Sequence, residues 1–182
     1  MKYLLIIALI FSFGFNGYAQ NEDKKLSKQE RKELRKKEQQ ENLQKSSDIA
    51  ESKHFILEAH TLVGRRGQSA PIQPNLNFFA TDGENVTIQL AFPAAPWPGY
   101  NGLGGLTVDG RVSQYKITKG KKTVSIRIDA MSSIGSYQIF INANYGSTST
   151  MRITGNRGER FEFRGTLLPL EENNVYKGTP LF

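Results

Sequence analysis

Hydrophobic and polar residues alternate with a period of two through most of the chain after residue 53. The alternation is cleanest over residues 123–128 and 137–142. Runs rich in Val, Ile, Phe, Tyr and Thr, separated by Gly, Asn and Asp, are typical of strands. The pattern predicts nine short strands, at residues 54–61, 76–81, 85–92, 105–108, 112–118, 122–129, 136–144, 148–154 and 160–167.

Nine strands without a helical repeat between them predict an all-β domain over residues 53–182, built as an antiparallel sandwich or barrel. One side of each strand is expected to be buried and the other wet. An outer-membrane barrel is disfavoured, because the predicted strands are shorter than a membrane span requires and Arg127, Arg152 and Arg164 fall at outward positions.

The turns predict the register of three hairpins, because inward-facing residues must lie opposite each other. The expected loops are a two-residue loop that begins at Gly120, a three-residue loop over residues 82–84 and a longer loop over residues 155–159. The last loop also places Arg152 beside Glu162 on the solvent face. The predicted inward pairs are Ile117 with Val124, Tyr115 with Ile126, Phe78 with Ile88, Leu76 with Leu90, Ile153 with Phe161 and Met151 with Phe163.

Residues 20–52 differ in composition and predict a charged helical spacer. Residues 20–51 hold nine basic and eight acidic residues and few apolar ones, so the segment cannot bury itself and its charges nearly cancel. Ser27 and Glu30 have the spacing of a capping box. The leucines do not keep a heptad seam, which disfavours a coiled-coil dimer and leaves a monomer as the expectation.

Residues 1–19 have the pattern of a secretory signal peptide. Lys2 precedes an apolar run of about 13 residues, and Gly17 and Ala19 supply small residues where signal peptidase reads the chain. The run is shorter than the roughly 20 residues of a spanning helix, so no transmembrane span is expected after cleavage at Ala19. The mature protein is expected to be periplasmic or secreted.

The composition limits the chemistry of this 182-residue chain, which has no cysteine and two histidines. The lack of cysteine excludes thiol catalysis, disulfides, cysteine-ligated zinc, iron–sulfur clusters and a lipid anchor on cysteine. His54 and His60 would share one face of a strand about 20 Å apart, too far to bind one metal ion. We therefore expect no metal, no cofactor and no catalytic residue set.

The charge balance bears on the partner. The chain carries 24 basic and 17 acidic residues, for a net charge of +7. An exported basic domain meets envelope polyanions rather than nucleic acids, and its basic residues are not interleaved with aromatic ones in a nucleic-acid-binding pattern. The expected partner is an envelope protein or an envelope glycan or polyanion, and no nucleic acid is expected.

Residues 92–103 form the loop where binding residues are expected. The loop holds Trp97, which is the only tryptophan, together with Tyr100, three prolines and two glycines. The prolines predict a stiff, extended backbone. The aromatic side chains either fold back over an open end of the domain or form a platform for a sugar or a partner. Arg65 and Arg66, in another loop, are the candidate polar companions of that platform.

Several short strand and turn segments carry a resemblance to a known family. They are residues 52–55, 58–59, 66–67, 77–78, 88–92, 104–106, 109–112, 115 and 163–167. Together with the signal peptide and the spacer, they resemble an exported family of Bacteroidetes known as domain of unknown function 4251. The resemblance covers residues 52–170. It implies export and a compact β domain, and it carries over no catalytic residue.

These observations predict an exported, non-enzymatic protein that binds a partner protein or an envelope glycan or polyanion through its loops. Two alternatives stay open. One is a carboxylate-dependent glycoside hydrolase, whose two acids would meet only in the fold, about 5 to 9 Å apart in a cleft. The other is a purely structural envelope module.

The first testable prediction concerns processing. Signal peptidase should cleave after Ala19, so the mature protein should begin at Gln20, which readily cyclises to pyroglutamate. The intact mass of protein purified from the envelope fraction measures this. Retention of the residues before Gln20 would contradict export by this route.

Overall fold

The computed structural model describes residues 27–64, 66–92, 99, 101–144 and 148–179. One long helix precedes a series of strands, and a short 3-10 helix follows them. The elements are α1 (Lys28–Ser52), β1 (His54–Val63), β2 (Ser69–Pro71), β3 (Phe78–Asp82), β4 (Asn85–Leu90), β5 (Leu106–Lys119), β6 (Thr123–Ser132), β7 (Gly135–Asn144), β8 (Ser149–Gly155), β9 (Arg160–Pro169) and η1 (Leu170–Glu172).

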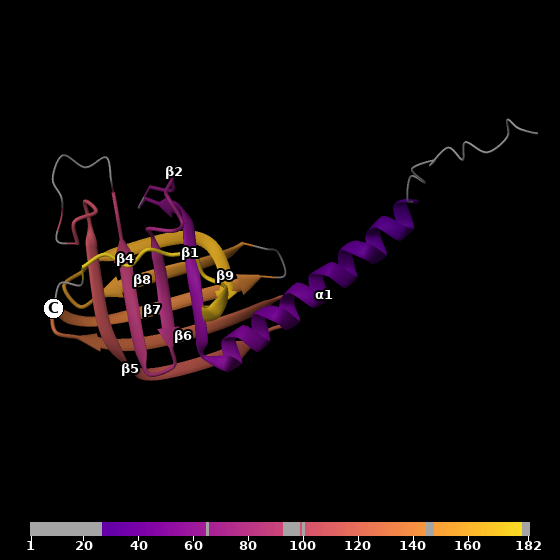
Figure 1. Ribbon diagram of the computed structural model, residues 1–182. Helices are drawn as coiled ribbons and strands as arrows, with labels where there is room; N and C mark the ends of the chain where they lie inside the picture. The colour runs from indigo at the N-terminus through magenta and orange to yellow at the C-terminus, as the bar shows by residue number, and fades with distance from the viewer. Residues whose placement is uncertain (1–26, 65, 93–98, 100, 145–147, 180–182) are drawn as a thin grey trace, which may run out of the picture. The chain divides into compact units, whose positions relative to one another are not determined.

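Within the described part of the chain, eight strands close into an antiparallel barrel. Strands β1 and β3 to β9 are hydrogen-bonded in chain order, and β1 also pairs with β9. The extra strand β2 pairs with residues 61–63 of β1 on the side where β3 pairs with residues 54–58. In Figure 1, β1, β3 and β4 cross β6, β7 and β8 on the two walls of the barrel. The open choice between sandwich and barrel is thus decided for a barrel.

Inward-facing side chains from every strand of the barrel fill its interior. An eight-stranded barrel is just wide enough to be filled by side chains, so this interior is a core. Phe55, Phe79 and Phe163 supply its largest buried rings, and Phe55 and Phe79 lie 6.1 Å apart between ring centroids. The aliphatic part of the core includes Leu57, Ile88, Val108, Val124, Ile126, Ile128, Ile139, Ile141, Met151 and Ile153.

The C-terminal end of α1 packs on the barrel. Ala50 has no exposed surface and belongs to the core, and Ser47 is also buried. The Tyr115 hydroxyl donates a hydrogen bond of 2.6 Å to the Ala50 carbonyl oxygen, and burial raises the pKa of the Tyr115 phenol. Lys119 forms an ion pair with Glu51. The solvated character expected of the spacer therefore does not extend to these last turns.

The N-terminal end of α1 has the predicted capping box. The Ser27 backbone nitrogen donates to Glu30 Oε2 at 2.7 Å, and the Glu30 nitrogen donates to Ser27 Oγ at 3.2 Å. The hydrogen bond from the Ser27 backbone lowers the pKa of the Glu30 carboxyl. Over the residues that the structure describes, no helix is long and apolar enough to cross a membrane.

The C-terminal segment, residues 173–179, is anchored to the outside of the barrel by Gln89. This side chain has no exposed surface although it faces outward from β4. Its Nε2 donates to the carbonyl oxygens of Leu76 and Tyr176, at 3.0 and 2.7 Å. Its Oε1 accepts from the Thr107 hydroxyl and the Gly178 backbone nitrogen. A buried amide satisfied at both ends fixes the segment in one position.

Two predicted strands are in fact one, and one strand was not predicted. Residues 105–108 and 112–118 belong to the continuous strand β5, whose register shifts between Val112 and Gln114 as at a β-bulge. The predicted gap, residues 109–111, comes before the shift and contains Asp109 and Gly110, which are residue types typical of turns. Strand β2 has three residues, all exposed, so it has no hydrophobic pattern to detect.

The predicted hairpin registers met three outcomes. The pairs around residues 155–159 are confirmed, including Arg152 beside Glu162. The register at Gly120 was wrong by two residues, because the two-residue loop begins one position later and pairs Ile117 with Ile126. A shift of two keeps the same side chains inside, so the hydrophobic pattern cannot detect it.

The register predicted for residues 82–84 was wrong by one residue. The loop has two residues, Gly83 and Glu84, and the inward pair is Phe79 with Ile88. Gly83 takes a φ of 90°, which glycine tolerates. The Asp82 carboxylate accepts hydrogen bonds from Asn85 and Glu84, and the bond from the Asn85 side chain contributes most to lowering the pKa of Asp82.

The second testable prediction concerns the closure of the barrel. A Cβ atom at Gly165 would lie 2.3 Å from the Glu58 carbonyl oxygen and 2.7 Å from Leu57 Cδ2. Gly165→Ala should therefore lower the free energy of unfolding by about 3 kcal/mol, measured by urea titration. Gly64→Ala is the control, because its Cβ meets only the flexible Gln68 side chain. Equal stability of the two variants would contradict tight β1–β9 packing.

Candidate binding face

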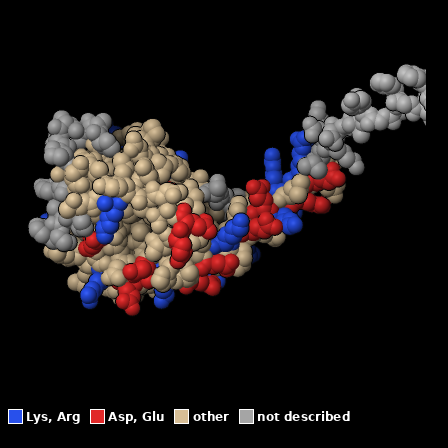
Figure 2. Space-filling model, viewed as in Figure 1, with Lys and Arg blue, Asp and Glu red and all other residues tan. Residues whose placement is uncertain are grey.

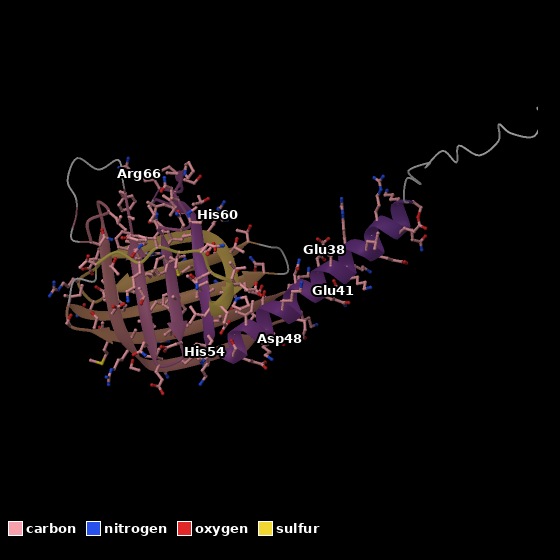
Figure 3. All side chains as sticks on the ribbon, viewed as in Figure 1. Glu38, Glu41, Asp48, His54, His60 and Arg66 are labelled. Atoms are coloured by element: carbon pink, nitrogen blue, oxygen red, sulfur yellow. The ribbon has the colours of Figure 1, made fainter. Side chains whose placement is uncertain are left out.

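Three of the four predicted site residues, Trp97, Tyr100 and Arg65, lie outside the described residues. The loop platform therefore stays a prediction. The fourth, Arg66, is exposed in the turn between β1 and β2, at the end of the barrel opposite His54 (Figure 3).

The two histidines do not form a site. His54 and His60 lie toward opposite ends of β1 in Figure 3. The ring of His60 contacts the Thr61 hydroxyl through Nδ1 at 3.0 Å. Among the described residues, no group of three or more His, Asp or Glu side chains could hold a metal ion.

Several carboxylates of the barrel have structural partners. Asp109 pairs with Lys177 of the C-terminal segment at 2.8 Å. Glu58 accepts a hydrogen bond of 3.3 Å from the backbone nitrogen of Asn174. Together with the turn formed by Asp82, these contacts hold loops and the C-terminal segment in place.

A row of side chains crosses the outer face of five consecutive strands. The register aligns Lys116, Arg127, Phe140, Arg152 and Glu162, one each from β5 to β9. Neighbouring strands are separated by 4.7 to 4.9 Å, so the row is about 19 Å long. We call this row and the outward rows on either side of it the arginine face. Its position on paired strands gives it a rigid backbone.

Phe140 is the centre of the arginine face. It is half-buried on an outward position, with Arg127 and Arg152 as its two cross-strand neighbours. The Arg127 guanidinium carbon lies 5.5 Å from the centroid of the Phe140 ring, which is the geometry of a cation–π contact. Phe140 is thus an outward aromatic residue with an arginine on each neighbouring strand.

Two acidic residues hold the arginines in place. Asp129 receives hydrogen bonds from Nε and Nη2 of Arg127, at 3.4 and 3.2 Å. Glu162 receives one from Nη2 of Arg152 at 3.4 Å. The four side chains remain 24 to 47% exposed, so these pairs orient the guanidinium groups without removing them from solvent. Solvent-exposed pairs of this kind contribute little to stability.

The flanking rows add hydrogen-bonding groups and positive charge. Ser125 Oγ donates to Asn142 Oδ1 at 2.8 Å, and Asn142 is exposed. With the central row, the face has five cationic and two acidic side chains. The flanking residues are Gln114, Asp129, Gln138, Thr154 and Arg160 on one side and Thr118, Ser125, Asn142, Thr150 and Arg164 on the other.

Charge is distributed differently on the wall formed by β1, β3 and β4. Figure 2 shows few basic or acidic side chains over that wall, and shows both signs intermingled along α1. The excess of positive charge on the arginine face is therefore a local property of β5 to β9.

The comparisons with known proteins agree with this architecture. The model of the family described as "Domain of unknown function (DUF4251)" matches residues 37–167. The chain belongs to the DUF4251 family. It is also similar to the crystal structure of a DUF4251 family protein from Bacteroides eggerthii, with 32% identity and a TM-score of 0.62 over 73% of this chain and 91% of that one. No curated protein matches the chain.

The family match identifies no site residue of this DUF4251 protein. The sequence analysis did not identify Phe140 as one either. The alternation did indicate its orientation, because Phe140 lies two residues from each of the outward residues Gln138 and Asn142. Its neighbours Arg127 and Arg152 come from β6 and β8, at separations that no local pattern connects. Only the registers of both hairpins together reveal the row.

The third testable prediction compares two adjacent residues of β7. Phe140→Ala should lower the free energy of unfolding by less than about 1 kcal/mol, because the ring is outside the core. Ile139→Ala should lower it by about 2–5 kcal/mol, because Ile139 has no exposed surface. Chemical denaturation measures both values. A loss from Phe140→Ala as large as that from Ile139→Ala would mean that the ring serves packing.

Proposed function

We propose that this DUF4251 protein is an exported, non-enzymatic binding protein that engages an anionic glycan of the cell envelope through the arginine face. The observation that carries the proposal is the row in which Phe140 lies between Arg127 and Arg152. Guanidinium groups bind carboxylate, sulfate and phosphate oxygens with paired hydrogen bonds. The aromatic ring supplies an apolar surface for the face of a sugar ring.

The shape of the face favours a polymer over a small molecule. The arginine face is the outside of a closed barrel and is convex, whereas sites for small molecules are concave. A convex surface gains affinity by distributing many weak contacts along an extended ligand. The outward amides and hydroxyls of Asn142, Thr150 and Thr154 provide hydrogen bonds on either side of the row.

Export supports the choice of ligand class. Residues 1–19 have the signal-peptide pattern, and the net charge of the chain is +7. A basic protein in the envelope meets acidic polysaccharides and lipid-linked glycans, and its charge raises the rate of encounter with them. The carboxylates Asp129 and Glu162 orient arginines, so the proposal gives them no part in bond cleavage.

The fourth testable prediction removes the two central charges. Arg127→Gln combined with Arg152→Gln should raise the dissociation constant for heparin, used as a model anionic polysaccharide, by tenfold or more, which is about 1.4 kcal/mol. Isothermal titration at low ionic strength measures the constant. Binding of the unaltered protein should weaken as salt is added, because exposed charges are screened.

The matched control removes the same charge elsewhere. Lys121→Gln combined with Lys122→Gln changes two exposed residues at the β5–β6 turn and should alter heparin affinity by less than threefold. Equal losses in both double variants would show that only net charge matters. Shortening of the polysaccharide during incubation would favour the glycosidase alternative.

A further inference from the structure

A groove lies between the C-terminal half of α1 and the end of β9. Its volume is about 490 Å³, within the range of sites that hold a ligand or a peptide side chain with its neighbours. Both walls belong to the compact unit Arg35–Phe182. The lining residues are Asn42, Lys45, Ser46, Asp48, Ile49, Ser149, Thr166, Leu167, Leu168, Pro169 and Glu172.

One wall of the groove is a strand edge. The pairing of β8 with β9 ends at Ser149 opposite Gly165. Strand β9 continues to Pro169, and residues 166–169 pair with β1 on their other side. Within the described part of the chain, no strand pairs with residues 166–169 on the β8 side, and all four residues line the groove. Such an edge presents backbone groups to which another strand can bind.

Ser149 supplies a hydroxyl group to the same groove. Ser149 is only 4% exposed and faces inward on β8, where it lines the groove. A serine hydroxyl can both donate and accept a hydrogen bond. A hydroxyl that lines the groove beside the edge of β9 is placed to bond to an incoming backbone.

The side chains of the groove define the occupant further. Ile49, Leu167 and Leu168 give it an apolar floor. Asp48 and Glu172 outnumber Lys45 among its charged residues, which favours a ligand with positive charge. Among the described residues, the lining has no aromatic side chain on which a sugar ring could stack, so their chemistry differs from that of the arginine face.

We propose that the groove binds an extended segment of a partner protein, which adds a strand to the open edge of β9. Residues 166–169 would bond to the backbone of the segment, and Ser149 would bond to one of its peptide groups. An apolar side chain of the segment would rest on Ile49 and Leu167, and a neighbouring lysine or arginine would face Asp48 and Glu172. This mode of recognition takes affinity from the main chain and specificity from alternate side chains.

The fifth testable prediction uses two synthetic peptides and the mature protein. The peptide acetyl-Lys-Val-Thr-Val-Lys-amide should shift the backbone amide NMR signals of Thr166, Leu167 and Leu168. The peptide acetyl-Glu-Val-Thr-Val-Glu-amide should bind at least tenfold more weakly, because Asp48 and Glu172 repel it. Peptide titration followed by NMR gives both dissociation constants.

Variants of the groove test the assignment of residues. Ser149→Ala should weaken binding of the basic peptide about fivefold, as expected for one hydrogen bond. Glu172→Gln should also weaken it, whereas Glu84→Gln, an exposed residue in the β3–β4 turn, should not. The heparin affinity of all three variants should stay unchanged, so failure of this proposal is distinguishable from failure of the arginine face.

Three outcomes would overturn the proposal. One is peptide binding that leaves the signals of residues 166–168 unmoved. Another is equal binding of the acidic and basic peptides. The third is a concentration-dependent shift of those signals without peptide, with a matching rise in mass by sedimentation, because a second copy of the chain would then be the occupant.

Discussion

The pairing of β1 with β9 is the constraint on which the rest of the structure depends, because it converts a sheet into a closed barrel. The two strands come from opposite ends of the domain's sequence, so their pairing closes a long loop of chain, which costs conformational entropy. Gly165 lets the strands approach, since a larger residue would meet the Glu58 carbonyl. Because α1 leads directly into β1, the same closure carries the end of β9 to the helix and creates the groove.

Closure of the barrel also gives the two sides of each strand different roles. The inward positions hold the hydrophobic core, so their residues are constrained by packing. The outward positions of β5 to β9 are free of that requirement, and there the chain places Lys116, Arg127, Phe140 and Arg152 in one row. The core therefore fixes the spacing of the outer residues without limiting their chemistry, which is the condition for a rigid binding face.

Local physical rules predicted the strands, the capping box and whether most strand residues face inward or outward. They could do so because periodicity and turn chemistry act over a few positions. They also predicted the β8–β9 register, because the inward pair Met151–Phe163 and the outward pair Arg152–Glu162 require the same alignment. They failed at the β5–β6 turn, because a shift of two leaves the same residues inside. They could not predict the row around Phe140 or the groove that Ser149 lines, because both depend on strands that meet only in the closed barrel.

Strand β8 connects the two proposed surfaces through its alternation. Ser149, Met151 and Ile153 point inward, and the first of them reaches the groove at the end of the barrel. Thr150 and Arg152 point outward and belong to the arginine face. A ligand on the convex face and a strand added to β9 would therefore contact opposite sides of the same rigid element. Because neither ligand needs the other's side chains, both could bind together, and a protein with these two surfaces would link an anionic polymer to a protein partner.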